Sequence, residues 1–171
     1  MTNFYNIENV SFLVVDDNKY MQNMLKAILR ALGVINVKVA DDGAEGLKEM
    51  RTFPADVIIC DWKMEPLDGI EFTRMVRTSS DSPNPYIPII MLTGFTEAGR
   101  VAEARDVGIN EFLAKPVSPR SLYARIQAII EKPRAFVRTA VYFGPDRRRR
   151  QTKYSGSNRR QTEDSEPAGQ A

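Results

Sequence analysis

Residues 10–17, VSFLVVDD, join a nearly all-apolar run to two adjacent carboxylates. The run is short, rich in β-branched residues and free of polar alternation, which indicates a strand buried on both faces of a parallel sheet. Asp17 and Asn18 follow it and are suited to cap a helix. The stretch therefore predicts a strand that ends in charge and leads into a helix, the first unit of an α/β fold.

The alternation of strand and helix continues to residue 131. Further strands are predicted at residues 35–40, 55–61, 87–93 and 109–114, and helices between Asn18 and Gly33 and at residues 44–52, 68–77, 96–107 and 118–131. Five such units give an open sheet with helices on both faces, because crossovers between parallel strands are right-handed. We expect a flavodoxin-like, doubly wound, five-stranded parallel sheet in the order 2-1-3-4-5.

Polar side chains stand where four of these strands end. Asp16 and Asp17 follow the first strand, Asp61 the third, Thr93 the fourth and Lys115 the fifth. The carboxyl ends of parallel strands share one edge, and the first and third strands are neighbours in this order. Three close carboxylates repel one another unless a divalent cation binds, and with a hydroxyl and an amine they suit Mg²⁺ and a phosphoryl group. The sequence predicts a phosphate-transfer site there.

Each of these residues also has an ordinary structural explanation. Asp17 taken alone would be a helix N-cap, Thr93 a strand-end hydroxyl and Lys115 a solvated loop charge. Asp16 beside Asp17, with Asp61 on the neighbouring strand, favours the site over these explanations. The chain contains no His, so any chemistry must use carboxylates, hydroxyls and Lys.

Four motifs in order, LVVDD, VIICDW followed by MEPLDG, MLTG and FLAKP, resemble the receiver domain of two-component response regulators of the chemotaxis-regulator class, over residues 10–132. The resemblance implies that Asp61 is the phosphoacceptor for a histidine kinase or a phosphotransfer protein. It also implies a signalling protein, with at most self-phosphorylation and self-dephosphorylation as enzymatic activity. Mg²⁺ would be held by Asp16, Asp17, Asp61 and the backbone carbonyl of Lys63.

The resemblance assigns further roles around the acceptor. Thr93 and Lys115 would bind the phosphoryl oxygens, Gly94 would leave room for the phosphoryl group, and the Lys115–Pro116 peptide would be cis. Phe112 stands at the position of an aromatic switch, although plain core packing remains open. The Lys63 amine either reaches the phosphoryl group or faces solvent, and Phe95 either folds inward or forms a partner surface.

The formal charge of +2 is unevenly distributed. Residues 133–171 carry nine Lys and Arg, eight of them Arg, against four Asp and Glu, which leaves +5. Their composition is too polar to build a core, so we expect a largely irregular basic tail. We therefore divide the chain into an N-terminal extension (1–9), a receiver domain (10–132) and an Arg-rich tail (133–171). Phe136, Val137 and Val141 are candidates to dock the start of the tail on the receiver.

The tail repeats the pattern Y-x-G-x-x-R-R at a spacing of 12 residues. Arg offers a bidentate fork to phosphate or guanine, Tyr a stacking face, and Gly a close backbone approach. The pattern is similar to Arg-rich extensions of chemotaxis-regulator-like proteins that bind cyclic di-GMP and act on the flagellar motor. The candidate nucleotide contacts are Tyr142, Gly144, Asp146, Arg147, Arg148, Tyr154, Gly156, Arg159 and Arg160.

Three functions compete at this point: a switch that is phosphorylated and binds a protein, an effector of a cyclic dinucleotide, and a DNA-binding regulator. The third is disfavoured because no helix-turn-helix or winged segment follows residue 132. For the first, the tail would bind anionic partners or nucleic acid nonspecifically. No apolar run approaches the length of a membrane span and the single Cys60 excludes an internal disulfide, so we expect a cytoplasmic protein.

Overall fold

A parallel sheet forms the centre of the structure, a computed structural model that describes residues 4–148 without the side chains of residues 95, 96 and 98. Its strand order is β2-β1-β3-β4-β5, which confirms the predicted flavodoxin-like topology. The strands are β1 (Phe12–Val15), β2 (Val37–Ala40), β3 (Val57–Asp61), β4 (Ile89–Thr93) and β5 (Glu111–Ala114). All pairings within this sheet are parallel.

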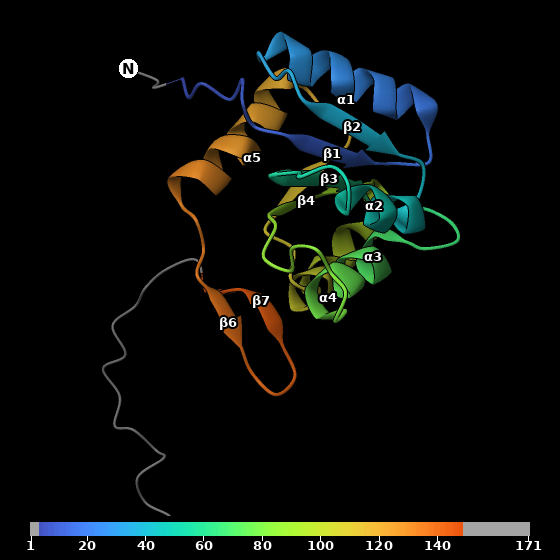
Figure 1. Cartoon of the computed structure of the whole chain (residues 1–171), viewed down its shortest axis with the longest axis vertical. Helices are drawn as coiled ribbons and strands as arrows, with labels where there is room; N and C mark the ends of the chain where they lie inside the picture. Colours follow the sequence, from blue (N-terminus) through green and yellow to red (C-terminus); the bar gives the residue numbers. More distant parts are fainter. Residues whose placement is uncertain (1–3, 149–171) are drawn as a thin grey trace, which may run out of the picture.

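Five α-helices cover the two faces of the sheet (Figure 1). They are α1 (Lys19–Ala31), α2 (Gly43–Met50), α3 (Gly69–Thr78), α4 (Val101–Val107) and α5 (Pro119–Glu131). The helix predicted at residues 96–107 is divided, because a 3₁₀ segment, η1 (Phe95–Arg100), precedes α4. Asn18 caps α1 by accepting a hydrogen bond from the Met21 amide at 3.1 Å. Asp17 is therefore not the cap of α1.

Two apolar cores flank the sheet. Leu13, Ile58 and Met91 point to the side of α2, α3 and α4, whereas Phe12, Ile59 and Leu92 point to the side of α1 and α5. Every residue of β1, β3 and β4 is buried, as the uninterrupted apolar runs predict. Within residues 4–148, no helix has the length and apolar character needed to cross a membrane.

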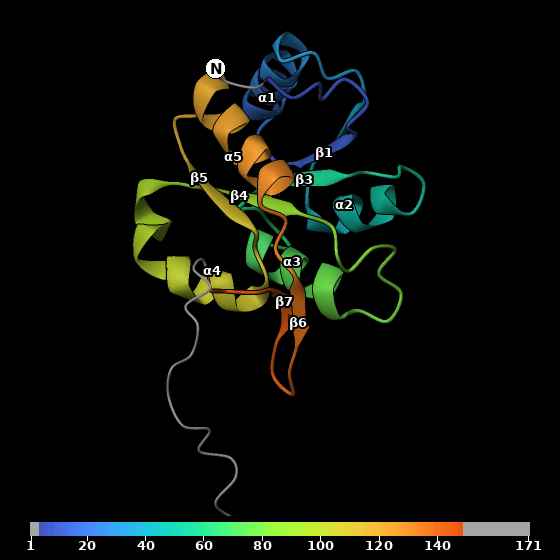
Figure 2. The same ribbon diagram turned by 90° about the vertical axis from the view of Figure 1, so that its left-hand side faces the viewer.

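The start of the tail is more ordered than its composition predicts. After Pro133 the chain forms an antiparallel hairpin of β6 (Phe136–Arg138) and β7 (Phe143–Pro145), which lies beside α3 and α4 (Figure 2). The rings of Tyr86, Phe136 and Phe143 contact one another with centroids 5.2–5.6 Å apart. Aromatic contacts with the receiver thus supply the core that the tail lacks by itself. Residues 149–171 lie outside the described part of the chain.

A buried guanidinium joins the hairpin to the receiver. Arg77, at 3% exposure, donates hydrogen bonds to the carbonyls of Gly108 and Pro85 and to Asn110 Oδ1 at 2.8–3.0 Å. The Phe136 ring lies 5.0 Å from this cation. Burial lowers the pKa of Arg77 to about 10, so the cation persists at neutral pH, where neutral oxygens and an aromatic face stabilise it.

The first Y-x-G-x-x-R-R copy begins at the end of the hairpin loop and includes β7. Tyr142 is buried, and its hydroxyl donates to the Pro145 carbonyl at 2.7 Å. A Cβ on Gly144 would lie 2.6 Å from that hydroxyl oxygen and 2.8 Å from Gly108 Cα. Glycine is required at position 144 because the tyrosine and the α4–β5 loop close on its backbone. Val141, in contrast, is 94% exposed and does not dock.

We predict that Gly144→Ala lowers the free energy of unfolding by about 1–3 kcal/mol, because the added methyl group overpacks this contact. Urea denaturation followed by circular dichroism measures the change. Gly99→Ala is the matched control, since a Cβ there meets no atom within 4 Å. A chain ending at Lys132 should be destabilised at least as much as Gly144→Ala. Parent-like stability of Gly144→Ala would contradict the docked hairpin.

Candidate functional site

The strand register brings the predicted polar residues to one edge of the sheet. Val15 pairs with Cys60, Asp61 with Leu92, and Thr93 with Ala114. The residues that follow these pairs therefore share the carboxyl edge, where the Lys115 amide donates to the Thr93 carbonyl at 2.9 Å. Asp16, Asp17, Asp61, Thr93 and Lys115 all lie at this edge, as the sequence predicts.

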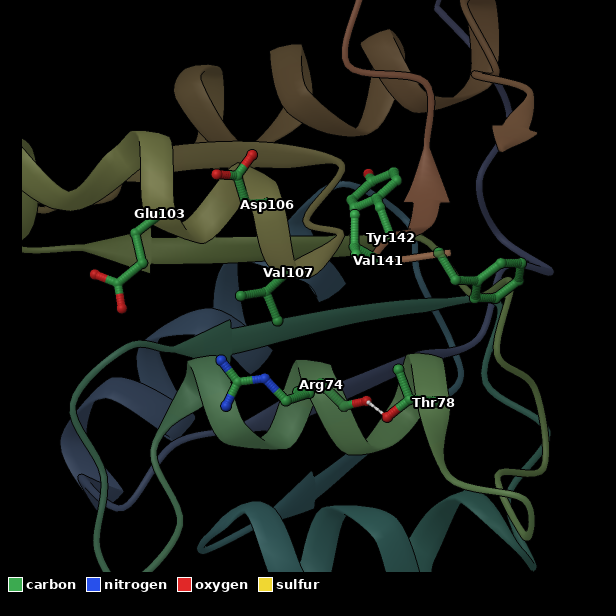
Figure 3. Close-up of a pocket in the computed structure, with 8 residues that line it drawn as sticks. Arg74, Thr78, Glu103, Asp106, Val107, Val141 and Tyr142 are labelled. Carbon is green, nitrogen blue, oxygen red and sulfur yellow. Dashed lines mark hydrogen bonds between the residues drawn. The ribbon is translucent and has the colours of Figure 1, made fainter. Parts of the chain in front are cut away.

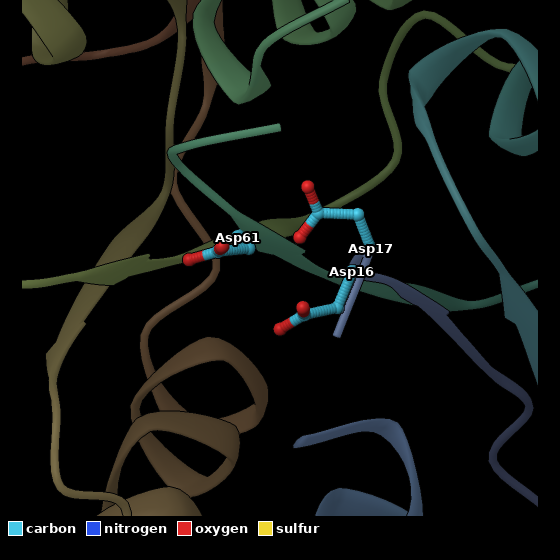
Figure 4. A group of neighbouring side chains, drawn as sticks. All are labelled: Asp16, Asp17 and Asp61. Carbon is cyan, nitrogen blue, oxygen red and sulfur yellow. The ribbon is translucent and has the colours of Figure 1, made fainter. Parts of the chain in front are cut away.

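Three carboxylates meet there (Figure 4). Asp16, Asp17 and Asp61 each offer one oxygen, and these oxygens lie within 4.8 Å of one another. Asp16 is fully buried, Asp61 is 5% exposed and Asp17 faces solvent. The cluster combines hard oxygen ligands with an open side, which suits Mg²⁺ because this ion keeps several waters.

Asp16 shows the clearest need for a cation. Its Oδ1 accepts a hydrogen bond from the Asn18 amide at 2.8 Å, whereas its buried Oδ2 has no hydrogen-bond partner among residues 4–148. Burial raises the pKa of Asp16 to about 6, with the Asn18 hydrogen bond opposing the shift. A divalent cation would supply the charge and the ligand bond that Oδ2 lacks, so these residues fit Mg²⁺.

Lys115 compensates the charge of Asp61. Its Nζ lies 2.7 Å from Asp61 Oδ1, and the Lys115–Pro116 peptide is cis, as the resemblance implies. Burial raises the pKa of Asp61, and the hydrogen bond from Lys115 opposes that shift. The Asp61 carboxylate is thereby held beside a cation at the edge where the buried Thr93 also lies, an arrangement suited to anionic phosphoryl oxygens.

The rim of the site adds residues that the sequence analysis did not single out to Asp17 and Lys63. A cavity of about 390 Å³ is lined by Asp17, Trp62, Lys63, Met64, Glu65, Asp68 and Arg100. The Lys63 amine lies 3.0 Å from Glu97 Oε1, and the Lys63 side chain is largely exposed. The Arg100 guanidinium lies 5.5 Å from the centroid of the buried Trp62 ring. Both contacts join η1 to the loop after β3.

Phe112 and Cys60, which the sequence places near the site, both pack in or against the core. Phe112 is half-buried and packs against the core on the side of α2, α3 and α4, so its switching role stays a prediction. The side chain of Phe95 lies outside the described part of the structure. Cys60 is fully buried, and burial raises the pKa of its thiol well above the ordinary value, which agrees with a packing role.

In the first copy of the tail repeat, the side chains contact other protein residues. Arg147 forms an ion pair with Asp106, and its guanidinium lies 4.8 Å from the Tyr142 ring centroid. Arg148 pairs with Asp146 at 3.0 Å. The side chains of Arg147 and Arg148 are 53% and 80% exposed, so they remain accessible to a ligand. Tyr154, Gly156, Arg159 and Arg160 of the second copy lie outside the described residues.

An open groove borders the start of this first copy of the repeat (Figure 3). It has a volume of about 610 Å³ and lies between α3, α4 and the hairpin, with Arg74, Thr78, Glu103, Asp106, Val107, Val141, Tyr142 and Phe143 along its walls. Basic, acidic and apolar side chains alternate there. The groove therefore shows no preference for one class of ligand.

We predict that millimolar Mg²⁺ raises the melting temperature by a few degrees, because the ion binds the folded carboxylate cluster and not the unfolded chain. Asp17→Asn should abolish this gain. Asp81→Asn, the same change at an exposed residue that pairs with Arg51 away from the cluster, is the control and should keep it. If Mg²⁺ does not change the melting temperature of the parent protein, the carboxylate cluster is not a Mg²⁺ site.

Comparison with known proteins gives one consistent family. Residues 12–127 match the family described as the response regulator receiver domain. The chemotaxis protein CheY of Pseudomonas aeruginosa is 32% identical over 123 residues, which are 72% of this chain and 98% of that protein. The chemotaxis protein CheY-3 of Vibrio cholerae is 30% identical over 125 residues, 73% of this chain and 95% of that protein.

Solved structures agree with this match. The chemotaxis protein CheY4 of Vibrio cholerae is 33% identical with a TM-score of 0.64, over 70% of this chain and 98% of that chain. The receiver domain of the sensor histidine kinase PA1611 from Pseudomonas aeruginosa, solved with a magnesium ion coordinated in its active-site cleft, is 30% identical with a TM-score of 0.63, over 71% of this chain and 98% of that chain. The sheet order, the acidic cluster and the match over residues 12–127 together show that the chain belongs to the response regulator receiver family.

Proposed function

We propose that the chain is a single-domain response regulator that accepts a phosphoryl group on Asp61 from a partner histidine kinase or phosphotransfer protein. The observation that carries the proposal is the buried Asp61 carboxylate, 2.7 Å from Lys115 and beside Asp16 and Asp17 at the edge of the sheet. A carboxylate with a cation on one side and a metal-binding cluster on the other is equipped to receive a phosphoryl group.

The transfer requires little covalent chemistry from the protein. An Asp61 oxygen attacks the phosphorus of a phosphohistidine, an O–P bond forms as the P–N bond breaks, and the electron pair returns to the imidazole nitrogen, which takes up a proton. Lys115 pairs with a phosphoryl oxygen and Thr93 donates its hydroxyl hydrogen to another. Bound Mg²⁺, held by Asp16, Asp17, Asp61 and the Lys63 carbonyl, supplies positive charge that offsets the phosphoryl oxygens.

We predict that acetyl phosphate with Mg²⁺ adds one phosphoryl group to the intact protein and that Asp61→Asn prevents the addition. Intact-mass spectrometry detects the product. Asp56→Asn is a control of the same chemistry at the opposite end of β3, where Asp56 accepts a hydrogen bond from the Ser11 amide, and it should be labelled like the parent. Labelling of Asp61→Asn, or no labelling of the parent by acetyl phosphate or a cognate kinase, would refute the proposal.

For the tail, we propose binding of a guanine dinucleotide, cyclic di-GMP, which controls a protein partner such as the flagellar motor. Support comes from the repeated motif and from the strong preference for Arg over Lys in the tail, since a plain charge attraction does not discriminate between them. Tyr142, Gly144 and Asp146 make contacts within the protein at and directly after β7. The proposal therefore gives these three a positioning role and assigns nucleotide contacts to Arg147, Arg148, Tyr154, Gly156, Arg159 and Arg160.

Charge-conserving substitutions test the ligand of the tail. Replacement of Arg147 and Arg148 by Lys should weaken cyclic di-GMP binding by about 1–3 kcal/mol for each lost bidentate contact, as calorimetry on the full chain measures. Arg51→Lys, at an exposed site that pairs with Asp81, should bind like the parent. Nonspecific anion binding would instead be favoured by three results together: equal affinity for cyclic di-GMP and cyclic di-AMP, an affinity that falls steeply as salt increases, and no effect of the Arg-to-Lys substitutions.

A further inference from the structure

A carboxylate rests against the glycine that was expected to leave room for a phosphoryl group. A Cβ on Gly94 would lie 2.8 Å from Glu97 Oε2. The Glu97 amide donates to the Gly94 carbonyl at 3.3 Å, which folds the start of η1 back over the end of β4. Gly94 directly follows Thr93, so the Glu97 carboxylate lies beside the chain at the end of β4, where Thr93 would bind phosphoryl oxygens in the proposed function.

This carboxylate is buried and paired. The Glu97 side chain is 5% exposed, and its Oε1 lies 3.0 Å from the amine of Lys63, a side chain that is 69% exposed. Lys63 comes two residues after Asp61, so the ion pair joins the loop after β3 to the loop after β4. A buried carboxylate depends strongly on such a partner, since its unpaired charge would carry a large desolvation penalty.

We infer that Glu97 is an internal anion that takes the place of the phosphoryl group in the unphosphorylated protein and is displaced when Asp61 is phosphorylated. The inference rests on the proposed phosphorylation of Asp61. A phosphoryl group brings about two negative charges, which compete with the Glu97 carboxylate for the same space and for the same cation. When Glu97 withdraws, Lys63 becomes the cation that faces the phosphoryl oxygens.

Displacement of Glu97 has a mechanical consequence. Glu97 belongs to η1, which continues directly into α4 and ends at Gly108. A Cβ on Gly108 would lie 3.1 Å from Arg77 and 3.2 Å from the Phe143 carbonyl, so this end of the segment is packed against the hairpin. A movement that begins at Glu97 is therefore transmitted along α4 toward β7, which Arg147 follows in the chain.

Beryllium fluoride with Mg²⁺, a phosphoryl analogue, allows the displacement to be measured without turnover. The fluorescence of Trp62, the single tryptophan of the chain, reports binding beside the acceptor. Glu97→Gln keeps the shape of the side chain and removes its charge, so it should bind the analogue roughly 3- to 30-fold more tightly, as expected for loss of one nearby like charge. Glu97→Asp keeps the charge but shortens the side chain, and its affinity should lie between those of the parent and Glu97→Gln.

The matched control is Glu49→Gln, which removes the same charge from a residue of α2 that pairs with Lys38 of β2. Its affinity should equal that of the parent. Equal affinities of the parent, Glu97→Gln and Glu97→Asp, with circular dichroism showing each folded, would mean a static ion pair and overturn the inference. If the fluorescence change of the parent protein on adding beryllium fluoride with Mg²⁺ is no larger than that of Asp61→Asn, the proposed phosphorylation is overturned, and the inference with it.

Discussion

Two carboxylates, Asp16 and Asp61, are buried side by side where the central strands end, and water screens neither from the other. Burial raises the pKa of both groups, so the metal-free edge of the sheet carries a standing electrostatic cost. Lys115 offsets part of it through its 2.7 Å contact with Asp61, and a divalent cation offsets the remainder. Because the cost arises from the fold itself, the same packing that buries β1 and β3 also favours binding of Mg²⁺ and, in the proposed function, of a phosphoryl group.

The fold and the convergence of the polar residues at one edge of the sheet were predictable from sequence, because each rests on a local signal with a geometric consequence. Apolar runs without alternation define buried parallel strands, and a parallel sheet places the residue after each strand at the same edge. Asp16, Asp61, Thr93 and Lys115 therefore converge although up to 99 positions separate them in the printed sequence. The split between η1 and α4 was not predictable, because Gly94, Gly99 and the neighbouring polar residues give no clear boundary.

Contacts between distant segments account for what sequence reasoning missed. The composition of residues 133–171 predicts no core of its own, and although Phe136 was a candidate to dock on the receiver, its partners Tyr86 and Arg77 and the part of Phe143 were not predicted. Arg77 is an ordinary helix residue in the sequence, and only the fold shows its guanidinium enclosed by carbonyl oxygens. Glu97 is likewise one acid among many until η1 brings it to Lys63. Such pairings depend on tertiary contacts, which local patterns do not encode.

Segment 94–108 takes part in two ion pairs, Lys63–Glu97 between the loops after β3 and β4 and Asp106–Arg147 beside the hairpin. The proposed phosphorylation of Asp61 depends on a carboxylate cluster that binds one ion. The most direct test is a crystal structure with Mn²⁺ in place of Mg²⁺, in which anomalous scattering locates the metal. The account predicts a single strong peak at the carboxyl edge, about 2.1–2.2 Å from carboxylate oxygens of Asp17 and Asp61 and close to Asp16. No peak there, or a peak bound only by other residues, would contradict it.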